Sequence, residues 1–330
     1  MQVNHFHDYV SPTTGNPLQL SRIDQTNDND VVEGTLSDEA TGDRFPIHRS
    51  IPRFVGQGNY ADSFGLQWNR YRRVQLDSVN GSRLSWDRFF EGTGWDPDKL
   101  RGARVLEAGC GAGRFSEVLL KCGARLCSFD YSSAVDAAWL NLGGAPGWSL
   151  CQADIFSLPY PEGSFDYVFC FGVLQHTPDP RRAFQSLVRA VKPGGQLAVD
   201  VYQRQSGLNK LAVKYWYRPI TRRLPHGVLL RLCEAYLPLW VPVDRLLGRI
   251  PLIGPALSSL VPCWNKWSLP LSRQHRMEWT ILDTFDAFSP EFDQPQSEPE
   301  VRDWFDDAGL VDVSVHPGGN GIEGSGRRAA

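Results

Sequence analysis

The strongest constraint on the fold is a glycine-rich turn that joins an apolar run to a helical segment. It spans Arg104-Val-Leu-Glu-Ala-Gly-Cys-Gly-Ala-Gly-Arg-Phe115, with glycines at Gly109, Gly111 and Gly113. Glycine is needed where the backbone turns sharply and comes close to a ligand, because a Cβ would block that approach. Amides at the start of the following helix can meet polar or anionic groups of the ligand. The turn therefore predicts an α/β fold with a ligand site at the carboxyl end of this strand.

Alternation of apolar runs and helical segments extends this pattern over a whole domain. Helical segments separate apolar runs at 104–108, 125–130, 148–152, 165–171 and 196–202. A helix at 298–308 and strands at 310–316 and 321–328 follow. Strands buried between helices form a parallel sheet covered on both faces. We therefore expect an α/β domain, residues 101–202 and 281–330, with a seven-stranded, mostly parallel sheet and helices on both faces.

Acidic residues follow three successive strands of this sheet. Glu107 lies two residues before the first glycine, Asp130 ends the second strand, and Asp154 follows the third. A carboxylate in the position of Asp130 can accept hydrogen bonds from both hydroxyls of a ribose. The glycine spacing differs from that of NAD-binding domains, because Arg114 occupies the position of their third glycine. The acids indicate one ligand lying across the carboxyl edge of the sheet.

These segments resemble the class I S-adenosylmethionine-dependent methyltransferases, in the branch related to ubiquinone-type and small-molecule enzymes. The resemblance covers about 101–202 and 298–328. It rests on the segments 105–114, 130–132, 153–155, 164–168, 173–177, 187–195 and 300–310. It implies a Rossmann-like domain that uses S-adenosylmethionine as cofactor.

The resemblance also implies which residues contact the cofactor. Glu107 and the glycines would hold the methionine part, Asp130 the ribose, and Asp154 with Ile155 the adenine. The full predicted cofactor-binding set is Glu107, Gly109, Cys110, Gly111, Gly113, Arg114, Asp130, Tyr131, Asp154, Ile155 and Phe171.

Two residues are candidates for catalysis. Methyl transfer is an in-line displacement, so the protein mainly positions the acceptor and removes a proton where one must leave. His176 follows the fourth strand, and an imidazole with a near-neutral pKa suits a general base. Tyr202, at the end of the fifth strand, is a second candidate. A histidine that only bonds backbone or contacts the cofactor is the alternative for His176.

The N-terminal segment, residues 1–59, is turn-rich with short alternating runs, which predicts a small β domain. It resembles the zinc-ribbon (Trm112-like) domain that precedes some methyltransferases, with Ser11–Leu18 and Leu36–Ile47 matching its turns. The positions of the zinc-binding cysteines hold Ser11, Thr14, Asp38 and Thr41. An unrelated β-rich extension is the alternative.

Two further segments differ from the α/β pattern. Residues 60–100 look helical and aromatic, and we expect them to cover the cofactor. Residues 203–280 form a predicted helical insertion after strand five, with eleven Lys and Arg against three Asp and Glu between Leu208 and Glu278, and five tryptophans. Basic amphipathic helices with Trp are typical of lids over amphiphilic substrates and of membrane-surface elements. A lid, a packing or homodimer surface, and a peripheral membrane contact stay open.

Composition narrows the function classes. The net charge of −3 gives no global reason for a nucleic-acid partner. The seven cysteines lie mostly in apolar runs, which favours a reducing, cytoplasmic location over a disulfide framework. Neither a secretory signal nor a membrane-spanning segment is expected.

The function hypotheses come in order of preference. The first is O-methylation of a small-molecule or amphiphilic acceptor. The second is an RNA (tRNA) methyltransferase, suggested by the basic insertion and the ribbon. The sequence after strand four, Phe171-Gly-Val-Leu174, disfavours a nucleobase amine as acceptor, because enzymes that methylate such amines carry Asp/Asn-Pro-Pro-Tyr/Phe there. The third is a non-catalytic, cofactor-binding regulatory subunit.

The N-terminal segment yields a testable prediction. Structural zinc needs thiolate or imidazole ligands in a tetrahedral array, and none stands at the four ribbon positions. Elemental analysis of the purified protein should therefore find no stoichiometric zinc. One zinc ion per chain would contradict the metal-free interpretation.

Overall fold

The computed structural model describes the chain except for residues 2, 29, 57, 205–213 and 252. Its centre is a seven-stranded sheet in the order β10-β11-β9-β8-β5-β6-β7. The strands are β5 (Arg104–Ala108), β6 (Arg125–Asp130), β7 (Trp148–Gln152), β8 (Phe165–Cys170), β9 (Val191–Val201), β10 (Leu310–Gly318) and β11 (Gly321–Arg328). The β5–β9 strands run parallel, and the β10–β11 hairpin is antiparallel beside β9. The predicted fold class is confirmed.

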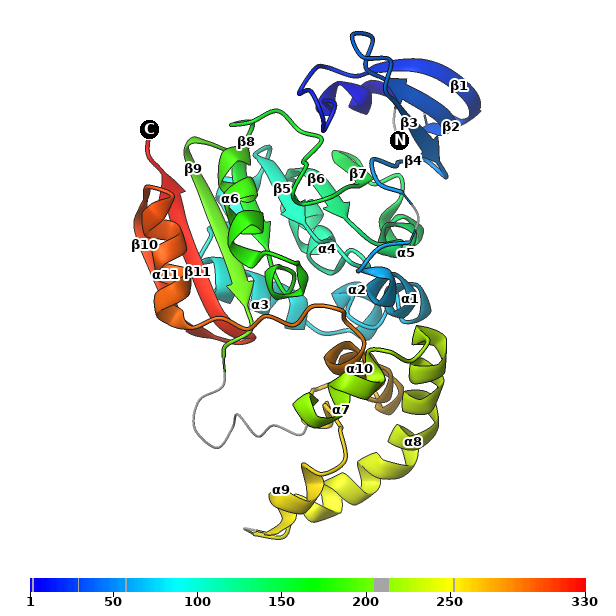
Figure 1. Ribbon diagram of the computed structural model, residues 1–330, viewed down its shortest axis with the longest axis vertical. Coiled ribbons are helices and arrows are strands. Elements are labelled where there is room, and N and C mark those ends of the chain that lie inside the picture. Colours follow the sequence, from blue (N-terminus) through cyan, green and yellow to red (C-terminus); the bar gives the residue numbers. More distant parts are fainter. Residues whose placement is uncertain (2, 29, 57, 205–213, 252) are drawn as a thin grey trace.

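Helices cover both faces of this sheet (Figure 1). On one face lie α6 (Pro180–Ala190) and α11 (Glu298–Asp307), where Phe184 and Phe305 pack against the sheet. On the other lie α3 (Leu84–Thr93), α4 (Arg114–Lys121) and α5 (Ala134–Leu142), with Phe89 in their shared core. The chain order reverses between β5 and β8, and ligands of open α/β sheets bind at such a switch point.

The N-terminal residues form a separate antiparallel sheet. Its strands are β1 (Gln19–Asn27), β2 (Asp30–Ser37), β3 (Arg44–His48) and β4 (Ile51–Pro52), after the 3-10 helix η1 (Val3–Asp8). Residues that follow β4 connect this sheet to the central domain. Arg53 forms a 2.7 Å salt bridge with Asp136 of the helix that precedes β7, and the amide of Phe54 donates to the carbonyl of Gln152 at the end of β7. The small sheet is thereby fixed to the β7 edge.

Asp38 connects the two turns at which a zinc ribbon would bind its metal. Its carboxylate accepts hydrogen bonds from the Thr14 hydroxyl (2.6 Å), the Asn16 side-chain amide (3.2 Å) and the Ala40 amide (2.9 Å). Among the described residues no group of three or more His, Cys, Asp and Glu could hold a metal ion. Hydrogen bonds to one carboxylate thus join the turns.

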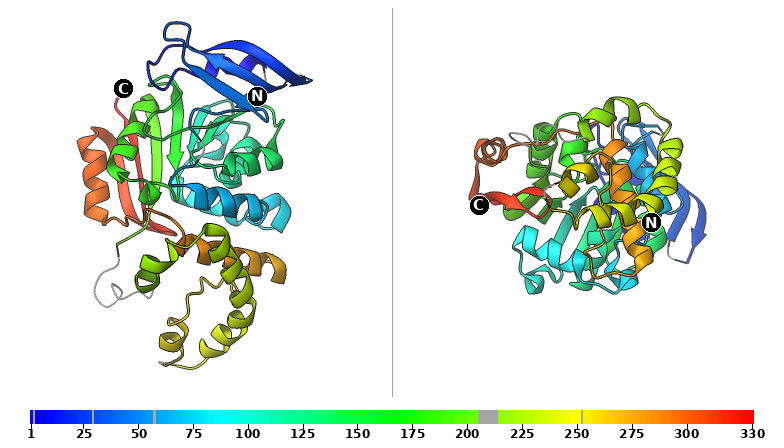
Figure 2. Two further views of the ribbon diagram at one scale, coloured as in Figure 1. Left: turned by 45° about the vertical axis from the view of Figure 1, so that its right-hand side comes forward. Right: turned by 90° about the horizontal axis from the view of Figure 1, so that it is seen from below.

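Helices enclose the carboxyl edge of the central sheet. Before β5 come α1 (Asp62–Arg70), α2 (Asp77–Asn80), α3 and the 3-10 helix η2 (Pro97–Leu100). After β9 come α7 (Lys214–Thr221), α8 (His226–Leu247), α9 (Ile253–Ser258) and α10 (Arg273–Phe288). Figures 1 and 2 show this second group at the end of the molecule opposite the N-terminal sheet. No helix in the described part of the chain is long and apolar enough to cross a membrane.

The helical insertion is longer than the sequence predicts. The expected boundary at residue 280 lies inside α10, whose buried face continues from Trp279 through Leu282 to Phe285. This face packs against α1 and α8. The boundary was wrong because the apolar pattern of α10 is set by these neighbours and not by the sheet.

Candidate cofactor and acceptor site

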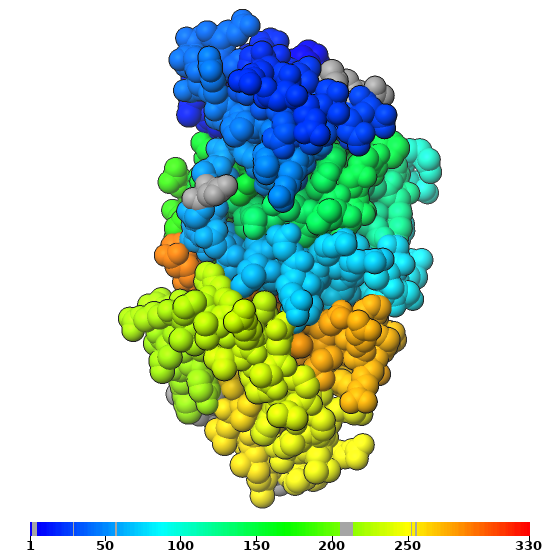
Figure 3. Space-filling view, turned by 90° about the vertical axis from the view of Figure 1, so that its right-hand side faces the viewer, coloured from blue at the N-terminus to red at the C-terminus, as the bar shows by residue number. Residues whose placement is uncertain are grey.

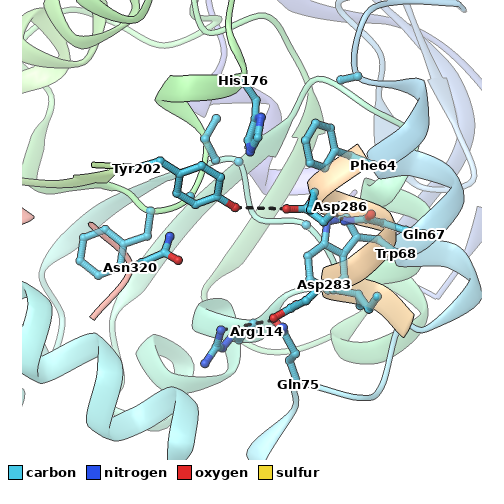
Figure 4. A pocket seen from close by; sticks show the side chains of 18 of the residues that line it. Phe64, Gln67, Trp68, Gln75, Arg114, His176, Tyr202, Asp283, Asp286 and Asn320 are labelled. Carbon is cyan, nitrogen blue, oxygen red and sulfur yellow. Dashed lines mark hydrogen bonds between the residues drawn. The ribbon is translucent and has the colours of Figure 1, made fainter. Parts of the chain in front are cut away.

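A cavity of about 780 Å³ opens at the carboxyl edge of the sheet, bounded by α1 and α10. Most of the sequence-predicted site residues line it: Gly109, Cys110, Gly111, Arg114, Asp130, Tyr131, Ile155, Phe171, His176 and Tyr202. Three do not: Glu107, Gly113 and Asp154. The structure therefore brings together most of the predicted set around one space (Figure 4).

The glycine turn has the left-handed backbone that its sequence predicts. Gly109, Gly111 and Gly113 have φ angles of +77°, +52° and +89°. A Cβ on Gly109 would lie 2.2 Å from Val173, and one on Gly111 would lie 3.1 Å from the Trp68 ring. Gly113 faces Leu142 of α5 instead, which explains why it does not line the cavity. The turn is thus held tightly between the sheet, α1 and α5.

Asp130 connects the end of β6 to this turn. Its carboxylate accepts from the Gly111 amide (2.9 Å) and from the amide (2.9 Å) and hydroxyl (2.7 Å) of Ser132. Burial raises the pKa of Asp130, while these three hydrogen bonds act in the opposite direction. The carboxylate also borders the cavity, where it can accept from a ligand hydroxyl.

Glu107 lies beneath the turn and not in the cavity. Its carboxylate accepts from the Ser116 hydroxyl of α4 (2.5 Å) and the Ser128 hydroxyl of β6 (2.8 Å). Alternate residues of a strand share a face, so Glu107 points with Val105 toward α4. The direct contact with the methionine part that the resemblance implies is therefore absent from this arrangement. Glu107 instead joins the strand to the helix that follows the turn.

Asp154 also lies outside the cavity lining. Its carboxylate accepts from the Phe156 amide (2.9 Å) within a tight turn, whereas the neighbouring Ile155 side chain reaches the cavity. The resemblance assigned both residues to adenine. In the structure, Ile155 offers an apolar side chain to the cavity, whereas the Asp154 carboxylate serves to form the turn.

His176 occupies the far end of the cavity from Arg114 (Figure 4). Its Nδ1 lies 3.0 Å from the Phe292 carbonyl oxygen, and its Nε2 is buried without a hydrogen-bond partner. A carbonyl can only accept, so Nδ1 carries the proton and Nε2 of the neutral ring presents a lone pair. Burial lowers the pKa of His176. His176 therefore lines the cavity as a neutral imidazole whose unprotonated Nε2 is itself buried.

Tyr202 stands next to His176, with ring centroids 5.3 Å apart in an edge-to-face arrangement. Its hydroxyl donates to Asp286 over 3.1 Å, and the Gln67 amide donates to the other carboxylate oxygen over 3.1 Å. Burial raises the pKa of Tyr202, and the Asp286 carboxylate raises it further. Tyr202 is therefore a neutral phenol whose oxygen keeps lone pairs for a cavity ligand.

The acids of α10 were missed by sequence reasoning. Asp283 and Asp286 both line the cavity, and Asp283 pairs with Lys266 at 2.5 Å. Their spacing of three residues on an otherwise apolar helix places them on one face, and that spacing was the available signal. The aromatic residues of α1, Phe64 and Trp68, also line the cavity. Their spacing is visible in the sequence, but the direction of their side chains is not.

A strap of residues 292–296 holds the two candidate catalytic residues in place. Phe292 provides the carbonyl that His176 bonds. The Gln294 side chain donates to the Thr177 carbonyl (2.7 Å), and the Gln296 amide donates to the Tyr202 carbonyl (2.8 Å). The strap therefore connects the loop after β8 to the end of β9.

The buried Glu107 carboxyl yields a pH prediction. Burial raises its pKa from 4.5 to about 7. A raised folded-state pKa stabilises the fold below pH 4.5, and this contribution is lost as the pH rises through 7. Between pH 5 and pH 8, Glu107→Gln should therefore gain roughly 2–3 kcal/mol in unfolding free energy relative to the wild type. Urea unfolding at both pH values measures this.

The control is Glu39→Gln, which removes an exposed carboxyl from the N-terminal sheet. It should show no comparable change between the two pH values. If the difference in unfolding free energy between Glu107→Gln and the wild type does not change with pH, the raised pKa of the buried carboxyl is contradicted.

Comparison with known proteins supports the same region of the chain. Residues 106–199 match a family described as Methyltransferase domain. The ubiquinone biosynthesis O-methyltransferase of Thiobacillus denitrificans is 35% identical over 156 residues, which cover 46% of this chain and 63% of that protein. That of Ralstonia nicotianae is 32% identical over 142 residues, covering 42% and 56%. The matches thus span less than two thirds of these relatives.

Solved structures of similar shape include a Haloferax volcanii complex between the Trm112 methyltransferase activator and a methyltransferase described as putative. It has a TM-score of 0.47 and 15% identity, and covers 82% of this chain and 99% of that chain. An S-adenosylmethionine-dependent methyltransferase from Aquifex aeolicus has a TM-score of 0.40 and 16% identity, covering 78% and 96%. Because both TM-scores lie below 0.5, these two structures carry no weight in the comparison, which rests on the family match. Residues 106–199 are thus similar to methyltransferase domains.

Proposed function

We propose that the protein transfers a methyl group to an oxygen of a small-molecule or amphiphilic acceptor. The observation that carries this proposal is the buried, unpartnered Nε2 of His176, whose side chain lines the cavity. Oxygen acceptors lose a proton during methylation, so a positioned base assists the reaction. The relatives' names, ubiquinone biosynthesis O-methyltransferases, agree with an oxygen acceptor.

The cavity residues fit S-adenosylmethionine. The backbone of Gly109 and Gly111 comes close to the cavity without side chains, and the Asp130 carboxylate borders it, where it can accept from a ribose hydroxyl. Ile155 and Phe171 supply apolar walls. When bound, the cofactor supplies an activated methyl group. These residues would hold it at the β5–β6 side of the cavity.

His176 would act as the general base. Its Nδ1 proton is committed to the Phe292 carbonyl, so the free Nε2 can take the proton of an acceptor hydroxyl. Its lowered pKa keeps the ring neutral, and hence able to accept a proton, at neutral pH.

Tyr202 and Asp286 would position the acceptor. The tyrosine hydroxyl donates to Asp286, which fixes its direction and leaves its oxygen to accept from a second donor group of the acceptor, because the one proton of the reacting hydroxyl goes to His176. Lys266 pairs with Asp283 and Lys214 lies over the Tyr202 ring, so the acids of α10 are matched by cations at the cavity. A small acceptor with a free hydroxyl and an apolar body suits these groups.

The proposal requires Asp130 for cofactor binding. Asp130→Ala should weaken the binding of S-adenosylmethionine by about 1–3 kcal/mol, because a charged hydrogen bond is lost. Isothermal titration calorimetry measures this, with Asp98→Ala at an exposed position as the control. Wild-type affinity in the Asp130 variant would remove the ribose assignment.

The proposal also requires His176 for turnover. Methyl transfer from labelled S-adenosylmethionine is measured in three parallel assays, whose acceptors are small hydroxylated aromatics, a lipid extract and an RNA pool. His176→Gln should lower methyl transfer by about 10²–10⁴-fold with little change in cofactor affinity. In the wild type the rate should rise with pH and level off above a pKa below 6.5, and the variant should lose this dependence.

The matched control is His316→Gln, an exposed histidine on β10. It should behave as wild type. Full turnover in His176→Gln would exclude the base, and labelling of the RNA pool alone would favour the RNA methyltransferase alternative.

A further inference from the structure

The exposed apolar side chains of the protein concentrate in one region. Of the large apolar residues exposed in the described part of the chain, most lie between Tyr215 and Trp264. Within this stretch the most exposed are Leu239 (77%), Ile220 (66%), Ile253 (64%) and Leu246 (60%). Figures 1 and 3 show that α8 and α9 form the end of the molecule farthest from the N-terminal sheet. This end therefore presents an apolar surface where solvent would favour polar groups.

Helix α8 explains the surface, because it is apolar on two sides. One side, which includes Leu229, Leu230, Cys233, Leu237 and Val241, is buried and packs against α10. The other side carries the exposed residues Val228, Leu232, Leu239, Val243 and Leu246. At 100° per residue these five fall within one narrow stripe, well separated from the buried side. We call this exposed stripe the outer face of α8.

Basic residues surround the outer face. Arg222 and Arg223 precede α8, Arg231 and Arg245 lie on it, and Arg249 follows it, all five exposed. Arg222, Arg223 and Arg249 form no salt bridge with an acidic side chain among the described residues.

The only acids between 214 and 264 already have partners. Glu234 bonds Arg70 and the Tyr71 hydroxyl, and Asp244 accepts from Ser258 and Asn265. The surface around the outer face is therefore both apolar and positively charged.

This combination selects among the molecules that could cover the surface. A second copy of the chain would bring arginines against arginines, since its own acids in this region are engaged, and like charges across an interface are unfavourable. Nucleic acid would match the charge but leave the leucines and isoleucines uncovered. An anionic lipid surface meets both requirements, because the side chains enter the acyl boundary while the arginines meet headgroups.

We propose that the outer face of α8, together with α9, docks on the surface of an anionic lipid bilayer. Tyr215 and Trp264, in the same apolar stretch of the chain, are both exposed and part of the cavity lining. Docking would bring the cavity close to a membrane-held amphiphilic acceptor. This last point rests on the proposed function, whereas docking itself does not.

Vesicle flotation of the full-length protein tests the proposal without the methyl-transfer reaction. Vesicles of phosphatidylcholine with phosphatidylglycerol should carry the protein at low salt and release it as the salt concentration rises. Vesicles of phosphatidylcholine alone should carry much less. Leu239→Ser with Leu246→Ser should weaken binding by at least about tenfold, because two exposed leucines lose their burial in lipid.

Two matched variants control for non-specific effects. Leu140→Ser changes a leucine on α5 that is 65% exposed and lies outside the surface, and it should float as wild type. Arg222→Gln with Arg223→Gln should lower binding to the anionic vesicles and reduce its salt dependence. Circular dichroism confirms that each variant is folded.

Absence of flotation at low salt would overturn the proposal, as would equal loss in the Leu140 variant. Sedimentation tests whether a second copy of the chain covers the surface. If the wild type is a dimer and Leu239→Ser with Leu246→Ser is a monomer, the surface binds a second copy and lipid docking is refuted. If flotation fails while methyl transfer proceeds, docking alone is wrong. If flotation succeeds while no acceptor is methylated, the proposed function is wrong and docking stands.

Discussion

The hydrogen bond between His176 Nδ1 and the Phe292 carbonyl is the interaction on which the account of the site depends. It joins a loop of the α/β domain to the strap that returns from the insertion, across more than a hundred residues of sequence. It also fixes which ring nitrogen carries the proton, because a carbonyl oxygen cannot donate. Without it, Nε2 could carry the proton and would no longer be a base. The chemical role of His176 is thus decided by a backbone group of a distant segment.

The buried acids of the site serve different purposes according to their partners. Glu107 accepts from the hydroxyls of Ser116 and Ser128 and has a pKa raised by burial, so it is a structural link between β5, β6 and α4. Asp130 bonds two backbone amides and still borders the cavity, so it both shapes the glycine turn and offers an oxygen to a ligand. Asp286 holds the Tyr202 hydroxyl. Burial alone does not identify a ligand-binding acid; the direction of its oxygens does.

Local sequence was sufficient for the sheet and the glycine turn. Strands of five or six apolar residues and glycines with positive φ depend mainly on neighbouring residues, so their pattern predicted them. The direction of Glu107 was not accessible in the same way, because position near a turn does not tell which face of the strand a side chain takes. The acids of α10 were missed for a related reason. Asp283 and Asp286 reach the site only because α10 packs on α1 and α8. That packing is tertiary and leaves only a weak periodicity in the sequence.

The tautomer and charge of His176 can be measured in solution. Nitrogen-15 NMR of the protein labelled in its histidines can observe both ring nitrogens, with His176→Gln used to assign the signals. At neutral pH the account predicts a neutral ring with the proton on Nδ1 and a bare Nε2. It also predicts that the ring gains a second proton only at a pH below 6.5. A ring protonated at Nε2, or an imidazolium at neutral pH, would contradict the assignment of His176 as the base.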